Sequence, residues 1–92
     1  MIRRFRHKGL ERLFTTGNAS GVSAQQVRKI QMVLGLLNVV RSPSMMNAPG
    51  PWFHPLTGDR KGQYAVSISG NWRIVFEFEG EDATNVDLVD YH

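Results

Sequence analysis

The last three residues of the chain, Asp90-Tyr91-His92, can all exchange protons or hydrogen bonds with a bound substrate. Two other polar clusters precede them, and these read His-Pro-Leu-Thr-Gly-Asp-Arg at 54–60 and Asn-Trp-Arg-Ile at 71–74. Together the three clusters supply imidazoles, a phenol, a guanidinium and carboxylates within one short chain. Such groups can carry out acid–base chemistry on a phosphate without any requirement for a metal.

RNA is a substrate that suits this set, because the ribose 2′-hydroxyl is itself a nucleophile. Cleavage needs a group that accepts the 2′ proton, a group that donates to the leaving 5′ oxygen, and a cation that stabilises the phosphorane. Imidazole carries protons well because its pKa lies near about 6.5. His54 and His92 are therefore candidate proton carriers, and Arg73 could hold the phosphate with its planar fork.

Each of these residues also has an ordinary structural interpretation. His54 could cap the turn that follows it, and a terminal histidine such as His92 is often only solvated. Arg73 follows Trp72, which we expect to face the core, so Arg73 should lie on the opposite face of its strand. There it could bind a phosphate or pair with Asp90. Tyr91 could stack on a base, donate to a phosphate or cap the edge of a sheet.

The length of the chain predicts one domain, residues 1–92, with a single modest core. There is no cysteine, which fits a reducing cytoplasm. No apolar run follows the basic N-terminus, so neither a signal peptide nor a transmembrane segment is predicted. We therefore expect a cytoplasmic protein without a membrane association.

Positive charge is concentrated in the first part of the chain. The net charge is +3, but residues 1–58 hold eight Lys or Arg against one acidic residue, Glu11. A basic surface favours a polyanion through counterion release, which makes nucleic acid the leading partner class, although an uneven surface charge is an alternative. The basic residues predicted to contact RNA or the ribosome are Arg3, Arg4, Arg6, Lys8, Arg60 and Lys61.

The first half of the chain has helical periodicity. We expect a short strand at 2–6 and then a helix that carries Leu10, Leu13 and Phe14 and ends at Gly17. A capping box of the S-x-x-Q type at 23–26 should begin a second helix. The apolar stripe of that helix is Val27, Ile30, Val33, Leu34 and Leu37. Close packing against the first helix would explain Gly35 within this stripe.

The second half has strand periodicity. The segment 42–51 should be an extended loop, because the four prolines lie between residues 43 and 55. Alternation then predicts strands around 63–69, 72–78 and 84–90, with turns at 69–71 and 79–82. The expected fold is α+β, with an N-terminal strand and two helices packed on one face of a mostly antiparallel sheet of four to five strands. The other face should be open and carry Ser67, Arg73 and Tyr91.

Five segments give the chain a resemblance to a known family. They are Met1–Leu10, the pair Leu13-Phe14, the blocks at 54–60 and 71–74, and the Asp-Tyr-His end. In this order and spacing they resemble the HigB-type toxins (host inhibition of growth) of the RelE/ParE superfamily of bacterial toxin–antitoxin systems. The resemblance spans nearly the whole chain and implies a RelE-like fold.

The resemblance also implies an activity and partners. It implies cleavage of messenger RNA in the ribosomal A site, leaving a cyclic phosphate, without a cofactor. The catalytic residues of the family map onto His54, Arg73, Asp90, Tyr91 and His92. The implied partner is a HigA-like helix-turn-helix antitoxin. The toxin would contact operator DNA only through this antitoxin. Active relatives can carry a lysine where this chain has Thr57, which puts the rate in doubt more than the type of reaction.

Three alternatives stay open at this point. A metal could bind His54, Asp90 and His92, which resemble a triad of two histidines and one carboxylate. The chain could instead be a ParE-like toxin that inhibits DNA gyrase. It could also be a relative that has lost catalysis and retains only antitoxin binding.

Overall fold

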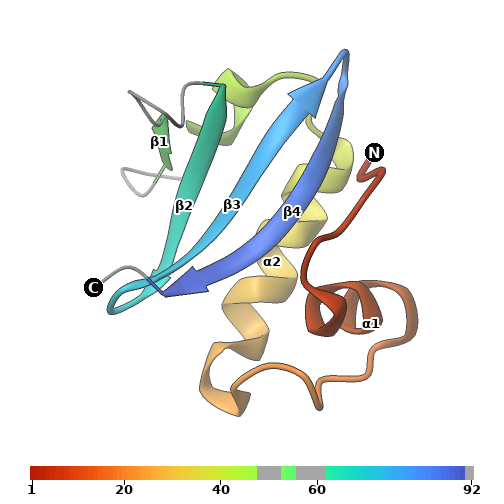
Figure 1. Ribbon diagram of the computed structural model, residues 1–92, viewed down its shortest axis with the longest axis vertical. Helices are drawn as coiled ribbons and strands as arrows, with labels where there is room; N and C mark the ends of the chain where they lie inside the picture. Colours follow the sequence, from red (N-terminus) through yellow and green to blue (C-terminus); the bar gives the residue numbers. More distant parts are fainter. Residues whose placement is uncertain (48–52, 56–61, 91–92) are drawn as a thin grey trace.

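The computed structural model describes residues 1–47, 53–55 and 62–90, and it has an α+β architecture. Its helical elements are α1 (Lys8–Thr16), η1 (Ala24–Gln26), α2 (Val27–Val39) and η2 (Pro43–Asn47). Its strands are β1 (Phe53–Pro55), β2 (Gln63–Ser69), β3 (Trp72–Glu79) and β4 (Asp82–Asp90). Figure 1 shows α2 crossing behind the strands, with α1 beside it. Among the described residues, no helix is long and apolar enough to cross a membrane.

The sheet consists mainly of β2, β3 and β4, which follow one another in antiparallel order, while the short β1 pairs with β2. The predicted strand at the N-terminus does not form as a continuous element. Instead, Ile2 and Phe5 make isolated parallel bridges to Ala83 and Val86 of β4. The side chain of Ile2 still reaches the core, so the bridges fix the segment to the edge of the sheet.

Helix α1 forms as its sequence predicts. Leu10 and Leu13 are buried, and Gly17 ends the helix in the left-handed conformation with φ of 79°. The sequence did not indicate the N-terminal cap: the Nδ1 atom of His7 accepts a hydrogen bond from the backbone N–H of Leu10 at 3.1 Å. This bond satisfies one of the free N–H groups in the first turn of the helix.

The apolar stripe of α2 is confirmed, because Ile30, Val33, Leu34 and Leu37 are all buried. The predicted capping box is wrong. Ser23 makes no side-chain cap, and the 3₁₀ turn η1 precedes the helix instead. Gln26 is buried, and its Nε2 atom donates to Oγ of Ser69 at 2.9 Å. The glutamine therefore connects the start of α2 to the end of β2 rather than closing its own helix.

The prediction that Gly35 packs closely against α1 is also wrong, because a Cβ at that position would meet nothing within 4 Å. The close approach of backbones occurs instead between Gly9 in α1 and Gly21 in the following loop. A Cβ at Gly9 would lie 2.6 Å from the carbonyl oxygen of Gly21. Two glycines at this contact let the loop lie directly against the first turn of α1.

The segment predicted as an extended loop after α2 begins with a 3₁₀ helix, Pro43–Asn47. Proline fits the first position of such a turn because its missing N–H has no partner there. Met46 is buried to 1% exposure, so this turn covers one end of the core. Residues 48–51, which complete the predicted loop, lie outside the described residues.

The core lies between the helices and one face of the sheet, where Val66, Ile68, Ile74 and Phe76 meet the stripe of α2. The predicted turn between β2 and β3 forms, and Gly70 adopts a positive φ of 53°. Trp72 was expected on the buried face, but it is 38% exposed. It is the first residue of β3, next to a register shift in β2, and so lies beyond the end of the core.

Strand β4 contains a β-bulge. The register passes from Val75↔Asp87 to Glu77↔Thr84, so that Asn85 and Val86 lie opposite the single residue Phe76. Asn85 has a positive φ of 52°, a conformation that asparagine tolerates better than most residues. The bulge lies where the N-terminal segment joins the sheet, since Phe5 bridges Val86.

Candidate active site

The face of the sheet away from the helices presents two adjacent rows of residues. One row runs across Ser67, Arg73 and Val89, and the other across His54, Ala65, Val75 and Asp87. Residues directly opposite one another in antiparallel strands share a face. The backbone register therefore brings the positions of His54 and Arg73, which are 19 residues apart in the sequence, into neighbouring rows.

Arg73 lies on this open face, as its alternation with Trp72 and Ile74 predicts. It is half-buried, and its Nε atom has essentially no contact with solvent. Its cross-strand partner is Val89, whereas Asp90 is paired with Trp72. Arg73 and Asp90 thus lie at the same end of the sheet, but their side chains start from opposite faces. The two side chains could contact the same substrate only if that substrate lies at the strand ends, within reach of both faces.

A cavity of ≈ 680 Å³ opens beside Asp90 on the helical side of the sheet. The residues that line it include His7, Gln26, Ser69, Trp72, Leu88 and Asp90. Nδ1 of His7 accepts the hydrogen bond that caps the N-terminus of α1, so Nε2 is the ring nitrogen left to interact with a bound group. Sequence reasoning missed His7, because nothing in its local pattern distinguishes a histidine that caps a helix from one on the surface.

A groove of ≈ 410 Å³ lies on the open face. It is lined by Arg6, Gln63, Val75, Asn85, Asp87 and Val89. Of these only Arg6 was a candidate from the sequence. Asn85 carried a weak signal that could have been used, because asparagine is depleted in strands and enriched at positive φ. Gln63 and Asp87 carried no signal, since polar residues alternate along any strand with one open face.

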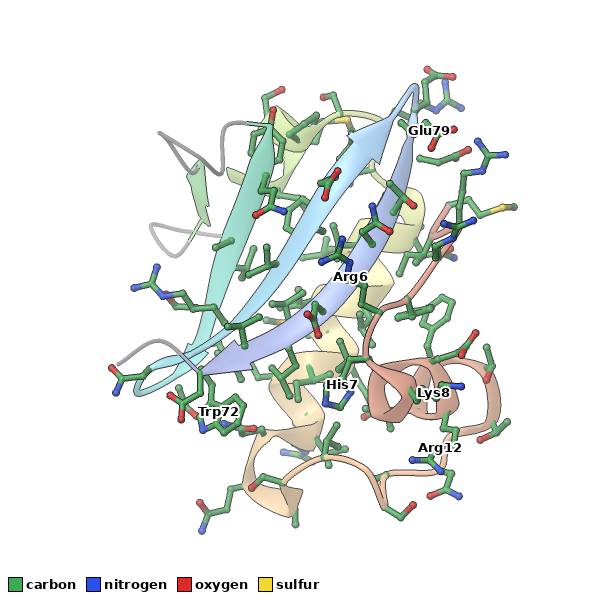
Figure 2. All side chains as sticks on the ribbon, in the orientation of Figure 1. Arg6, His7, Lys8, Arg12, Trp72 and Glu79 are labelled. Atoms are coloured by element: carbon green, nitrogen blue, oxygen red, sulfur yellow. The ribbon has the colours of Figure 1, made fainter. Side chains whose placement is uncertain are left out.

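The basic residues near the N-terminus differ in their surroundings. Nη1 of Arg3 lies 3.5 Å from Oε1 of Glu79, and its Nε lies 3.8 Å from Oδ2 of Asp82. Arg4, Arg6 and Lys8 are exposed. Figure 2 shows Arg6 at the edge of β4 and Lys8 on α1, so these cations point over different elements.

The remaining sequence candidates lie outside the described residues, either entirely or in their side chains. Arg60, Lys61, Tyr91, His92 and the unusual Thr57 belong to undescribed segments, and only the backbone of His54 is described. Within the described residues there is no group of three or more histidine, aspartate or glutamate side chains that could hold a metal ion. The triad of His54, Asp90 and His92 is not tested by this finding and stays a prediction.

The layered fold and the polar end of its sheet are consistent with a class of small bacterial toxins. The family model described as "RelE-like toxin of type II toxin-antitoxin system HigB" matches residues 3–92. A relative from Proteus vulgaris named "Endoribonuclease HigB" is 40% identical over 92 residues, which cover 100% of both chains. The chain therefore belongs to the HigB-like family of type II toxins, and the resemblance seen in the sequence is confirmed. Membership of such a family implies an antitoxin as partner.

Proposed function

We propose that this toxin is a ribosome-dependent endoribonuclease that cleaves messenger RNA by attack of the ribose 2′-hydroxyl. The observation that carries the proposal is the full-length similarity to a protein named as an endoribonuclease, at 40% identity. The backbone register supports it for His54 and Arg73, whose positions lie in neighbouring rows of the open face. Asp90 lies at the same end of the sheet as Arg73 but starts from the other face. The site would be completed by Tyr91 and His92, which directly follow Asp90.

The reaction requires two proton transfers and one charged intermediate. The 2′ oxygen forms a bond to phosphorus while the bond from phosphorus to the 5′ oxygen breaks. The 2′ proton passes to a base and the leaving 5′ oxygen receives a proton, which gives a cyclic 2′,3′-phosphate and a 5′-hydroxyl. We assign these transfers to His54 and His92, which can each serve as base or acid near neutral pH.

Arg73 would stabilise the negative charge on the phosphorane. Its guanidinium can donate two parallel hydrogen bonds to phosphate oxygens, and the shielding of its Nε atom from solvent favours such bonds. Asp90 would orient an imidazole, and Tyr91 would donate to the phosphate or stack on a base. None of these roles needs a metal ion or another cofactor.

The ribosome would supply the RNA in a cleavable conformation. In the part of the chain whose side chains the structure describes, Trp72 and Phe14 are the only exposed aromatic residues, which is fewer than the row of aromatics that single-strand binding surfaces use. We therefore place the substrate in the ribosomal A site and the toxin in the cytoplasm. Arg4, Arg6 and Lys8, with Arg60 and Lys61, would bind RNA or the ribosome, whereas Arg3 would do so only by leaving Glu79 and Asp82.

The antitoxin is proposed to be a HigA-like helix-turn-helix protein, and operator DNA would be contacted only through it. The fold is proposed to be RelE-like in detail, with a sheet of four to five strands when β1 and the N-terminal segment are counted. The bridges from Ile2 and Phe5 to β4 support this description, because they lie where an additional edge strand would pair.

Induction of the toxin without its antitoxin tests the proposal in cells. Growth should stop, and sequencing of RNA ends should show messages cut on translating ribosomes. A His54→Ala variant should restore growth while it still binds the antitoxin. If growth stops while messages stay intact and DNA supercoiling changes, the protein is a gyrase inhibitor of the ParE type. If growth continues while the antitoxin binds, the protein retains only the binding function.

A further inference from the structure

The open-face groove has a chemical character that differs from its basic surroundings. Val75 and Val89 are the apolar residues of its lining, and Gln63, Asn85 and Asp87 contribute polar groups. Val75 is buried to 5% exposure even though it faces away from the helical core. A lining that combines apolar valines with polar groups suits a flat heterocycle, which can stack on the valines and offer its edge to the polar groups.

Arg6 is positioned at the rim of this groove by the β4 bulge. Its backbone N–H donates to the carbonyl oxygen of Val86 at 2.8 Å, and the N–H of Val86 donates to the carbonyl oxygen of Arg4 at 3.1 Å. Arg6 has no ion pair with any residue in the described part of the chain. Its guanidinium is therefore available for a phosphate that lies beside the groove.

The bulge also places Asn85 at the groove. A residue other than glycine with φ of 52° is strained, and strained backbone and bulges concentrate near functional sites, where they redirect a side chain. Asn85 lines the open-face groove together with Arg6, and it also lines a smaller cavity with Arg3 and Arg4. The strained residue thus lies between the groove, which Arg6 lines, and the smaller cavity that Arg3 and Arg4 line.

Two polar residues of the groove, Asp87 and Gln63, each have a hydrogen-bond acceptor left for a ligand. Oδ1 of Asp87 accepts the backbone N–H of Leu88 at 2.9 Å, which leaves Oδ2 for a ligand. Nε2 of Gln63 donates to Oε2 of Glu77 at 3.3 Å, which leaves its carbonyl oxygen as an acceptor. The carboxylate of Asp87 also repels phosphate, so the phosphate belongs at Arg6 and the base belongs against the two valines.

We propose that this groove binds one nucleobase of the RNA next to the cleaved bond, and that it selects bases with an exocyclic amino group over uracil. The amino group of adenine, cytosine or guanine can donate to Asp87 and Gln63. Uracil offers a single N–H between two carbonyl oxygens, which the carboxylate repels. The groove adjoins the candidate catalytic positions in the sheet. Its residues Val75 and Asp87 lie in the same cross-strand row as His54. Its residue Val89 lies directly opposite Arg73. This inference rests on the proposed function.

Asp87→Asn is the direct test, because the amide oxygen keeps the bond to Leu88 and only the second acceptor is lost. Glu81→Gln is a matched control, since Glu81 is exposed in the turn between β3 and β4, away from the groove. Cleavage is mapped on a ribosome-bound message that presents each base at every codon position. The parent protein should prefer amino-bearing bases over uracil at one position by about tenfold or more, as expected for a hydrogen bond to a charged group. Asp87→Asn should reduce this preference to about threefold or less, and Glu81→Gln should retain it.

Two further variants separate the roles within the groove. Arg6→Ala should slow cleavage at all sites alike, because a phosphate contact does not distinguish bases. Asn85→Gly removes the side chain without adding strain, since glycine accepts the positive φ. This variant should change the base preference while the protein melts at nearly the parental temperature.

A binding measurement keeps the test independent of the cleavage rate. Trinucleotides of 2′-O-methyl adenosine and 2′-O-methyl uridine cannot be cleaved, and NMR titration should show the adenosine probe shifting the amides of Asn85, Asp87 and Val89 at lower concentration. If the parent cleaves RNA but Asp87→Asn retains the same base preference and the same probe affinities, the groove does not select the base. A parent protein that cleaves messages without any bias against uracil would overturn the inference equally. If it cleaves no RNA at all, the proposed function fails and this inference fails with it.

Discussion

Alanine should have opposite effects at two helical glycines, Gly9 and Gly35, and the structure determines the sign of each. Alanine favours an α-helix over glycine by about 0.8–1.0 kcal/mol. At Gly35 the new Cβ would meet nothing within 4 Å, so this gain should appear in full. At Gly9 the Cβ would lie 2.6 Å from the Gly21 carbonyl oxygen and 2.8 Å from Cε1 of His7. Forcing a methyl group into packed surroundings costs about 1–3 kcal/mol, which exceeds the helical gain.

The two variants can be compared by thermal melting and by urea unfolding. For a domain of this size, 1 kcal/mol corresponds to about 4–8 °C in Tm. Gly35→Ala should therefore raise Tm by several degrees, and Gly9→Ala should lower it. Gly21→Ala is a second test of the same contact, because its Cβ would lie 2.7 Å from Cα of Gly9. If Gly9→Ala melts as high as Gly35→Ala, the loop does not lie against α1 and the cavity beside Asp90 is shaped differently.

The remaining predictions concern the core, the phosphate site and the metal. In a urea titration, Leu34→Ala should lower the free energy of unfolding by about 2–5 kcal/mol. Met32 lies on the same helix but is 45% exposed, so Met32→Ala should change this free energy by about 0.5 kcal/mol or less. Arg73→Ala should reduce cleavage far more than it lowers Tm, and Arg73→Lys should rescue only part of the activity, because a point charge lacks the bidentate fork. Cleavage should survive EDTA when the magnesium that the ribosome needs is supplied as a controlled excess; loss of activity together with stoichiometric bound zinc or manganese would favour the metal triad.

The helices and strands that the sequence predicted well are those with long apolar periodicity. The buried faces of α2 and β2 could be predicted from the helical stripe and the strand alternation, because such periodicity depends only on local backbone geometry. The errors occurred where tertiary contacts override local signals. Ser23 and Gln26 have the residue types of a capping box, but a partner on β2, Ser69, was available to the glutamine. Gly35 was assigned a close contact that belongs to Gly9 and Gly21, which lie on different elements and carry no shared pattern.

The candidate site was predicted less completely than the fold. Arg73 could be assigned to the open face from its neighbours, because side chains alternate along a strand. The groove could not be foreseen, since it depends on a bulge at Asn85 and on a bridge from Phe5 to Val86, 81 residues further along the chain. The sequence also did not show that Asp90 and Arg73 start from opposite faces of the sheet, because this depends on the register of β3 with β4. The roles of His54, Tyr91 and His92 stay predictions.

The nucleophile of the reaction is the central claim, and one substrate substitution tests it most directly. The purified toxin is incubated with ribosomes programmed with a message that carries a single 2′-deoxynucleotide at the cleaved position, and the products are compared with those of the all-ribose message. We expect the all-ribose message to be cut to a cyclic 2′,3′-phosphate and a 5′-hydroxyl, and the substituted message to stay intact at that position. Cleavage of the deoxy-substituted message at the parental rate, or products that carry a 5′-phosphate, would contradict attack by the 2′-hydroxyl and the roles proposed for His54, Arg73 and His92.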